Sequence, residues 1–483
     1  MSNINSNPAD WLEREKNALE IVNVAGKLWL DDSVELIIFR RSIVDARASE
    51  ILNHHEYARN YINEPLTIEN SLAICTAIAD LGLAPSRIDI GMLGKEWLTE
   101  GRGNDADIAA FVERKLSNLI GKDKKVLKPK DVVLYGFGRI GRLAARLIIS
   151  QTGKGEQLRL KAIVTRTNSD LDITKRSSLL RKDSVHGKFR GTVIEDLENK
   201  ALIINGYPVK MIAANDPADI DYTAYGIEDA LLIDNSGVWR DAEGLSQHLK
   251  SKGISKVLLT APGKGDIPNI VYGVNHNTYA PESNDIFSAA SCTTNGIAPV
   301  LAVIEKKYGI ESGHIESVHS FTNDQNLLDN FHKKYRRGRS APLNMVITET
   351  GAAKAVSKVL PQVFNKFTGN AVRVPTPDVS LAILNINVSN EVESVEEIND
   401  LLNDASAYGD LVEQIDYSTS AELVSTDCIG NNHASIVDSH ATLLAPNKKS
   451  MVLYVWYDNE YGYTCQVVRL AKYLAKVQRL TYY

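Results

Sequence analysis

A glycine-rich turn between a strand and a helix is the feature that most constrains this fold. Asp131-Val-Val-Leu-Tyr135 reads as a buried strand, and Gly136-Phe-Gly-Arg-Ile-Gly141 follows it directly. The apolar residues after the turn recur with the spacing of one helix face: Ile140, Leu143, Ala144, Leu147 and Ile148. Such glycines allow a tight turn and bring a pyrophosphate close to the helix N-terminus. The pattern predicts the first βαβ unit of a dinucleotide-binding domain, rather than glycines that serve only a turn.

Three further short apolar runs extend this sheet. They are Leu158–Val164, Ala230–Asp234 and Lys256–Thr260, and each ends in polar or turn residues. Because these runs alternate with helical segments, we expect a mostly parallel sheet with helical crossovers.

Composition bounds the class of protein. The 483 residues are 44% hydrophobic, which is enough for a large core and two or three domains. The net charge of −6 gives no reason to expect nucleic acid or an anionic membrane as a partner. The chain has no run of about 18 apolar residues, and its start resembles neither a signal nor a transit peptide. We therefore expect a soluble cytoplasmic protein.

No metal site is expected from the local sequence. The four cysteines, at positions 75, 292, 428 and 465, have no metal-ligand spacing. His54 and His55 are adjacent, so on a helix they would point apart.

The first 128 residues show helical periodicity and no catalytic constellation. We expect one amphipathic helix that begins at Val34 and runs to about Ile62, and two more around Leu72–Ala79 and Ala106–Val112. The polar stretch Lys122–Lys130 reads as a linker. This extension is expected to pack on the rest of the protein or on a second subunit.

A second motif surrounds Cys292. Residues 285–290 read as a strand that ends in small residues, and the positions after the cysteine have helical spacing: Ile297, Val300, Leu301 and Ile304. A cysteine at a helix N-terminus faces the positive end of the helix dipole, which favours the thiolate. A lone cysteine is more often a small buried residue, but hydroxyl neighbours on both sides favour a reactive thiol. Pro299 requires the helix to kink or to start late.

The segment Ser288-Ala-Ala-Ser-Cys-Thr-Thr-Asn295 closely resembles the active-site signature of phosphorylating glyceraldehyde-3-phosphate dehydrogenases. The resemblance runs from about Asp131 to the C-terminus and leaves out the extension. It implies an α/β fold: a doubly wound Rossmann-type domain plus an α+β catalytic domain, preceded by the helical extension. We expect the extension over residues 1–128, the dinucleotide-binding domain over 129–291 with a C-terminal helix 464–483, and the catalytic domain over 292–463. Gly296 stands where many members of the family carry a second cysteine, and we expect this difference to leave the chemistry intact.

The resemblance also implies roles for individual residues. Cys292 is the expected nucleophile and His319 its acid–base partner. The expected cofactor-binding residues are Gly136, Phe137, Gly138, Arg139, Ile140, Gly141, Arg166, Thr260 and Asn459, the last holding the nicotinamide carboxamide. The expected phosphate-binding residues are Ser291, Thr293, Thr322, Thr350, Gly351 and Arg373. Of these, Thr322 and Arg373 resemble the substrate-phosphate site, and Thr293, Thr350 and Gly351 resemble the site for inorganic phosphate.

The loop from Phe321 to Asn344 departs from the family pattern at one position. Asp324 stands where typical members carry a threonine, and with residues 323–332 it resembles the related erythrose-4-phosphate dehydrogenases. The basic residues farther along the loop match a family segment that borders a neighbouring subunit's cofactor site, which implies a homotetramer.

Together these features predict reversible, phosphorylating oxidation of glyceraldehyde 3-phosphate to 1,3-bisphosphoglycerate. Erythrose 4-phosphate is the alternative substrate, and a catalytically silent scaffold is the alternative of another class. The cofactor is NAD or NADP. Arg166 occupies the place of the acid that usually binds the ribose hydroxyls of NAD, which favours NADP unless Arg166 points into solvent.

Overall fold

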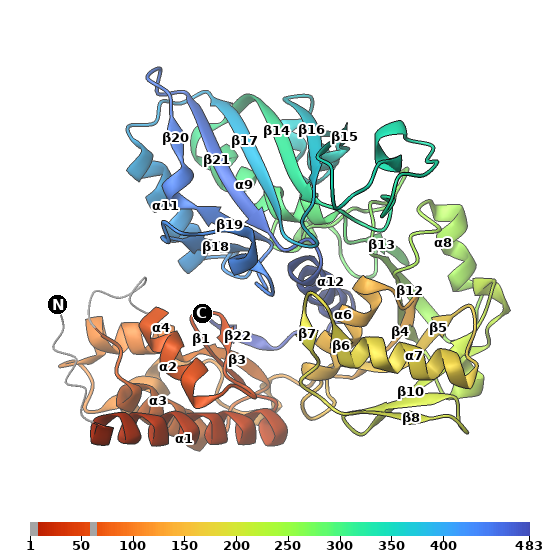
Figure 1. The fold of residues 1–483 in the computed structure, drawn as a ribbon. Helices are drawn as coiled ribbons and strands as arrows, with labels where there is room; N and C mark the ends of the chain where they lie inside the picture. Colours follow the sequence, from red (N-terminus) through yellow and green to blue (C-terminus); the bar gives the residue numbers. More distant parts are fainter. Residues whose placement is uncertain (1–7, 58–64) are drawn as a thin grey trace. The chain divides into compact units, whose positions relative to one another are not determined.

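The computed structural model describes residues 8–57 and 65–483 (Figure 1). The chain forms two compact units, each described by itself. The first comprises Met1–Pro129, Thr152–Gln157 and Val477–Tyr483, and the second comprises Lys130–Gln151 and Leu158–Lys476. Within the described ranges, no helix has both the length and the apolar character needed to cross a membrane.

The second unit contains an eight-stranded sheet of strand order β13-β12-β11-β4-β5-β10-β9-β8. Its strands are β4 Lys130–Tyr135, β5 Leu158–Thr165, β8 Val193–Asp196, β9 Ala201–Ile204, β10 Tyr207–Ala213, β11 Ala230–Asp234, β12 Ile254–Leu259 and β13 Ile286–Ser288. The pairs from β13 to β10 are parallel, while β9 and β8 are antiparallel additions. A two-stranded hairpin, β6 Lys182–Asp183 and β7 Gly187–Lys188, lies outside this sheet.

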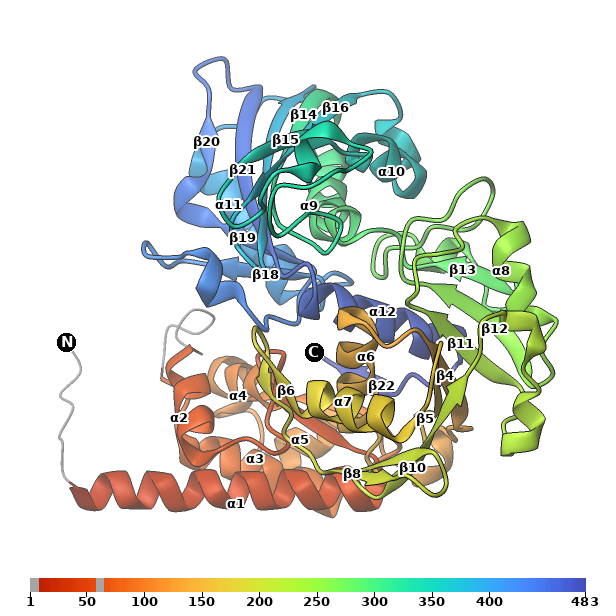
Figure 2. The same cartoon turned by 45° about the vertical axis from the view of Figure 1, so that its right-hand side comes forward.

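Helices cover both faces of this sheet, as Figure 2 shows with α8 on one side and α6 and α12 on the other. They are α6 Arg139–Ser150, α7 Asp170–Arg181, α8 Ala242–Leu249 and α12 Tyr461–Leu474. Every residue of β11 is buried, as expected for a parallel strand that is covered on both faces. The doubly wound domain predicted from the glycine turn is confirmed.

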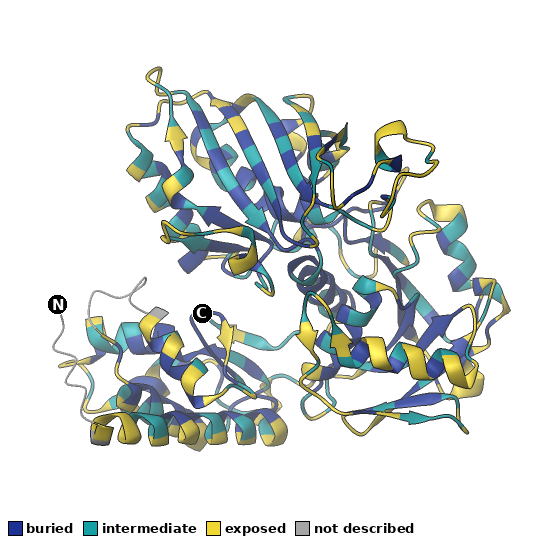
Figure 3. Ribbon diagram, in the orientation of Figure 1, coloured by how far each residue is buried: buried dark blue, intermediate teal, exposed yellow. Residues whose placement is uncertain are grey.

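A second large sheet forms the catalytic domain, with strand order β15-β16-β14-β17-β21-β19-β18. Its strands are β14 Ile310–Ser320, β15 Val346–Glu349, β16 Phe367–Val374, β17 Ser380–Val388, β18 Ile415–Ser418, β19 Ser435–Asp438 and β21 Ser450–Tyr457, and β20 Leu443–Leu444 pairs with β21. Its helices are α9 Cys292–Tyr308, α10 Ala352–Val359 and α11 Val395–Ala407. Burial alternates along β17 and β21, so one face of the sheet packs against the helices (Figure 3).

Helix α9 forms the centre of the catalytic core. Its residues Ile297, Val300, Leu301 and Ile304 pack in one cluster with apolar residues of β17 and β21. Ser291 caps the helix by accepting a hydrogen bond from the backbone N–H of Thr294 at 3.0 Å. The helix begins at Cys292 and contains Pro299, so it does not start late. Gly309, with φ of 69°, ends it.

The first unit contains a sheet that sequence periodicity did not predict. The helix expected from Val34 is wrong: β1 Glu35–Ile38 and β2 Arg41–Ser42 occupy its first half, and α2 Ala48–Tyr57 follows. Residues 58–62 of that expected helix lie outside the described ranges. Leu36, Ile37 and Ile38 are all fully buried, and such a short continuous apolar run does not distinguish a buried strand from a helix.

The remaining elements of this unit are mostly helical. They are α1 Pro8–Asp32, α3 Ile68–Asp80, β3 Ser86–Asp89, α4 Ile90–Glu96, a π-helical turn Trp97–Gly101 and α5 Ile108–Leu116. The helices expected around Leu72–Ala79 and Ala106–Val112 are confirmed by α3 and α5.

The C-terminus returns to the first unit. The helix expected over residues 464–483 ends at Leu474, and Leu480–Tyr482 form β22 instead. This strand runs parallel to β3 and completes the sheet order β2-β1-β3-β22. Arg479 anchors the segment: its guanidinium lies 3.5 Å from Glu35 and 4.2 Å from the ring centre of Trp29. Long-range pairing of this kind leaves no periodic signal in a nine-residue tail.

A buried carboxylate holds the strand ends of the first unit together. Asp89 is fully buried between β3 and α4. Its oxygens accept hydrogen bonds from the backbone N–H groups of Phe39, Arg40, Gly91 and Met92 and from the Arg40 guanidinium, at 2.8–3.2 Å. One side chain thus caps α4 and fixes the turn between β1 and β2, where Phe39 and Arg40 have positive φ.

Replacing Asp89 with Asn should loosen the first unit without touching the chemistry at Cys292. The substitution removes the buried charge facing Arg40 and places an N–H₂ group against donors, a loss of about 3–5 kcal/mol in opening free energy. Hydrogen exchange of residues 35–43 and 86–92 measures this opening free energy. Asp45→Asn, at an exposed position of the same unit, should change opening by less than about 0.5 kcal/mol. Unchanged exchange in Asp89→Asn would contradict this account.

Candidate active site

The glycine turn has the geometry that an anion needs. Gly136 has φ of 94°, and a Cβ on Gly141 would lie 2.4 Å from the carbonyl oxygen of Gly136. A Cβ on Gly138 would meet no atom within 4 Å, so nothing in the chain fills this side of the turn. Gly138 is also the N-cap of α6, and no side chain caps that helix. Its first N–H groups are therefore suited to a pyrophosphate, and a nicotinamide dinucleotide fits this turn.

The other residues of the turn pack or pair. Phe137 is buried, and Arg139 donates two hydrogen bonds to Glu460, which precedes α12. Arg139 thereby fixes the N-terminus of α6 against the segment that carries Asn459.

The end of β5 presents a cation. Arg166 is exposed, whereas the hydroxyl and amide groups around it bond to the chain itself. Thr165 Oγ1 donates to the carbonyl of Thr167 at 2.8 Å, Asn168 donates to the carbonyl of Met211 at 2.8 Å, and Ser169 caps α7. Farther along the sheet edge, Thr260 Oγ1 donates to the carbonyl of Asp234 at 3.0 Å. Arg166 is the cation of this group, and its side chain is exposed.

Cys292 and His319 meet where α9 begins and β14 ends. Cys292 Sγ lies 3.6 Å from His319 Nε2, although the two residues belong to different elements. His319 Nδ1 lies 2.7 Å from the carbonyl oxygen of Ser320. A carbonyl can only accept, so the tautomer with the proton on Nδ1 satisfies this shorter contact and turns the Nε2 lone pair to the thiol.

Arg373 of β16 lies behind this pair. Its Nη1 is 3.2 Å from His319 Nδ1, and it donates to the Ser320 carbonyl at 2.9 Å and to Thr322 Oγ1 at 3.4 Å. Burial raises the pKa of the Cys292 thiol, while the Arg373 charge acts to lower it. Burial, and then Arg373, lower the pKa of His319 to about 3. Burial therefore acts against the thiolate that a helix N-terminus favours, while Arg373 acts for it.

The Asp324 side chain faces a cation that sequence reasoning did not assign to it. Arg337 donates a hydrogen bond to Asp324 and another to Thr348 Oγ1. Burial acts to raise the pKa of Asp324, but Arg337 outweighs it and the pKa is lowered. A basic run in a loop is usually solvated, so only the folded loop identifies Arg337 as this partner.

Of the expected inorganic-phosphate residues, Thr293 contacts the Cys292 thiol, whereas Thr350 and Gly351 lie at the start of another helix. Thr293 is buried, and its hydroxyl lies 3.1 Å from the hydroxyl of Tyr457, which also bonds Ser317 at 2.9 Å. Thr350 Oγ1 accepts a hydrogen bond from Ala352 N at 3.1 Å, and Gly351 precedes α10, which has no side-chain cap. Within the described part of the chain, no hydrogen bond links Thr350 or Gly351 to Cys292 or His319. Their phosphate role stays a prediction.

Asn459 lies at the end of β21 and is buried. Its Oδ1 accepts hydrogen bonds from Ser320 Oγ at 2.9 Å and from Ser380 Oγ at 2.8 Å. These bonds orient the amide so that its N–H₂ group remains to donate. Tyr457 and the two serines were not predicted, because single hydroxyls on strands carry no sequence signal.

The fold and site define a class: an oxidoreductase with a nicotinamide-binding domain and a cysteine that contacts a histidine. Residues 130–242 match the glyceraldehyde 3-phosphate dehydrogenase NAD binding domain, and residues 291–459 match the C-terminal domain of the same enzyme. The chain therefore belongs to the glyceraldehyde-3-phosphate dehydrogenase family.

Relatives differ in whether they include the extension. The chain is 50% identical over 460 residues to a "glyceraldehyde-3-phosphate dehydrogenase-like protein" of Pseudomonas aeruginosa, covering 95% of this chain and 98% of that protein. It is 41% identical to glyceraldehyde-3-phosphate dehydrogenase of Zymomonas mobilis and 40% identical to glyceraldehyde-3-phosphate dehydrogenase 1 of Bacillus subtilis. These two matches cover 71% of this chain and 98% of each relative. The Pseudomonas protein thus shares nearly the whole chain.

Replacing His319 with Asn should slow alkylation of Cys292 by iodoacetamide at neutral pH. Asn cannot accept the thiol proton, and loss of one positioned base lowers rates by about 10²-fold or more. The rate is measured by mass spectrometry of the Cys292 peptide. His314→Asn changes another histidine of β14, which bonds Thr368, and should leave the rate unchanged. Equal rates in His319→Asn and the wild type would show that the imidazole does not act on the thiol.

Proposed function

We propose that this protein oxidises glyceraldehyde 3-phosphate with a nicotinamide cofactor and inorganic phosphate, giving 1,3-bisphosphoglycerate. The observation that carries the proposal is the pairing of Cys292 with His319 in front of Arg373. A thiol, an adjacent base and a fixed cation are the groups that thioester chemistry on an anionic aldehyde requires.

The residues would act in sequence. Cys292 Sγ attacks the aldehyde carbon as His319 Nε2 takes the thiol proton, and the backbone N–H of Cys292 stabilises the developing oxyanion. His319 returns that proton to the oxyanion, which gives the thiohemiacetal hydroxyl, and takes it back as hydride leaves the carbon and the thioester forms. A nicotinamide held at Asn459 would supply the hydride acceptor. Phosphate then attacks the thioester carbonyl, and the released sulfur regains its proton from His319.

Arg373 and Thr322 would bind the phosphate of the substrate. The Arg373 guanidinium contacts Thr322 Oγ1, so the two donors converge on one anion. Thr293, Thr350 and Gly351 would receive inorganic phosphate. Arg337 neutralises Asp324, which removes the repulsion that an unpaired carboxylate would exert on a phosphate.

Erythrose 4-phosphate oxidation is the second candidate, favoured by the Asp324 segment. In that reaction water replaces phosphate as the acyl acceptor. A silent scaffold is the remaining alternative, and the close approach of Cys292 to His319 argues against it. A cytoplasmic homotetramer, implied by the long loop 321–344, is part of the same proposal.

An assay with both aldehydes, with and without phosphate, tests the substrate. We expect higher kcat/KM on glyceraldehyde 3-phosphate and turnover that depends on phosphate, because phosphate releases the acyl group from Cys292. Cys292→Ser should lose this activity. A rate indifferent to phosphate, with higher kcat/KM on erythrose 4-phosphate, would reverse the assignment. Full phosphate-dependent activity in Cys292→Ser would exclude the mechanism.

We further infer that Arg166 favours NADP over NAD. Its exposed guanidinium lies at the end of β5, where a 2′-phosphate of the adenosine ribose is recognised in dinucleotide folds. A charge-assisted pair of this kind contributes about 1.5–3 kcal/mol, which corresponds to roughly ten- to a hundredfold in affinity.

Arg166→Asp should therefore raise KM for NADP by at least about tenfold and leave KM for NAD unchanged or lower. Steady-state kinetics with both cofactors measure the two constants. Lys175→Asp makes the same change of charge at an exposed position of α7 and serves as the control. The same KM for NADP in Arg166→Asp and in the wild type would show that Arg166 does not contact the 2′-phosphate.

A further inference from the structure

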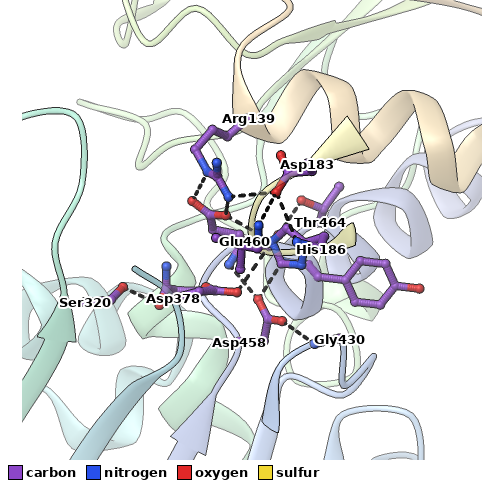
Figure 4. A network of polar contacts seen from close by, with 12 residues as sticks. Arg139, Asp183, His186, Ser320, Asp378, Gly430, Asp458, Glu460 and Thr464 are labelled. Carbon is purple, nitrogen blue, oxygen red and sulfur yellow. Dashed lines mark hydrogen bonds and ion pairs between the residues drawn. The ribbon is translucent and has the colours of Figure 1, made fainter. Parts of the chain in front are cut away.

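A buried group of polar side chains lies between the cofactor-binding sheet and the catalytic sheet of the second unit (Figure 4). His186 comes from the turn of the β6–β7 hairpin, and Asp378 lies between β16 and β17. Asp458 and Glu460 lie between β21 and α12. These three segments are far apart in the sequence, which is why local ligand spacing did not reveal the group.

The ligand atoms are close enough to share one ion. One nitrogen or oxygen atom from each of His186, Asp378 and Asp458 lies within 4.8 Å of the others. His186 Nε2 is 3.5 Å from Asp378 Oδ2 and 3.0 Å from Glu460 Oε2. Metal–ligand bonds of about 2.0–2.1 Å place neighbouring ligand atoms roughly 3–3.4 Å apart. The His186–Asp378 separation is already close to that geometry, and the remaining pairs lie within 4.8 Å.

The environment of Asp378 is a second observation, independent of these distances, that indicates a bound ion. The Asp378 side chain is fully buried, and its neighbours are the His186 imidazole at 3.5 Å, the Val379 backbone and the Asp458 carboxyl. Among the described residues, no hydrogen bond of ordinary geometry reaches either carboxylate oxygen. A buried carboxylate without donors is strongly unfavourable, so an ion or proton must compensate it. The Asp458 oxygens differ, because they accept backbone N–H bonds from Gly430, Glu460 and Tyr461 at 2.6–2.9 Å.

The charges around the group do not balance. Arg139 pairs with Glu460 and, at 3.4 Å, with Asp183, and Arg142 lies 3.5 Å from Asp183. The charges of Arg139 and Arg142 thus balance those of Glu460 and Asp183. Asp378 and Asp458 remain, with the His186 imidazole as the nitrogen group facing them. Two buried carboxylates and one imidazole have the charge and donor atoms that a divalent cation needs.

We propose that His186, Asp378 and Asp458 bind one divalent transition-metal cation. The mixed nitrogen and oxygen donors suit Mn²⁺ or Zn²⁺ better than Ca²⁺, which prefers oxygen ligands alone. Bound there, the cation joins the β6–β7 hairpin to the catalytic domain, one residue away from Asn459. The site is separate from the thiol chemistry, and its existence does not depend on the proposed substrate.

Mn²⁺ is the probe of choice, because Zn²⁺ would also bind the Cys292 thiol. The full chain is treated with a chelator, desalted and titrated with MnCl₂ while free Mn²⁺ is measured by electron paramagnetic resonance. We expect one Mn²⁺ per chain and a melting temperature that rises with bound metal. Asp378→Asn should weaken binding by at least tenfold, because it removes one of the two carboxylate ligands.

Two further variants make the result decisive. His186→Gln removes the nitrogen ligand and should weaken binding as Asp378→Asn does, which guards against misfolding of one variant. Asp438→Asn changes a carboxylate that accepts from Trp456 Nε1 at 3.1 Å elsewhere in the catalytic domain, and it should bind Mn²⁺ like the wild type. Absence of bound Mn²⁺ in the folded wild type overturns the proposal. So does full binding in both ligand variants.

Discussion

The contact between Cys292 and His319 depends on how two elements of the catalytic domain meet. Ser291 caps α9 and sets the first residue of the helix, while β14 carries His319 to the same point. The sulfur and the imidazole nitrogen are 3.6 Å apart, and the apolar face of α9 packs in one core with β17 and β21. Hydrophobic packing of one helix therefore positions the reactive pair.

Burial then decides the protonation of the pair. Removing a thiol and an imidazole from water favours their neutral forms, and Arg373 adds to this effect on the imidazole. A neutral imidazole with Nδ1 bonded to Ser320 is oriented as a base toward the thiol. Arg373 contacts both His319 and Thr322, so one cation orients the base and faces the expected substrate phosphate.

Local motifs were enough to predict the main architecture, while long-range contacts were not. The glycine turn after Tyr135 and the segment around Cys292 are combinations of residues that occur in few kinds of structure. Both lie on the elements that the sequence predicted. The short run Val34–Ile38 was misassigned because a buried strand and a buried helix share the same composition. Strand β22 and the group around Asp378 arise from residues brought together only by folding. The pairing of Asp324 with Arg337 also depends on folding, because Arg337 is one of several basic residues in its loop.

Trapping the acyl intermediate tests the central claim most directly. The protein is mixed with glyceraldehyde 3-phosphate and oxidised cofactor in phosphate-free buffer, quenched with acid and digested for mass spectrometry. The account predicts a 3-phosphoglyceryl group on the peptide that contains Cys292, lost when inorganic phosphate is added before the quench. Cofactor reduction with no acyl group on Cys292, or with the group on another cysteine, would contradict it.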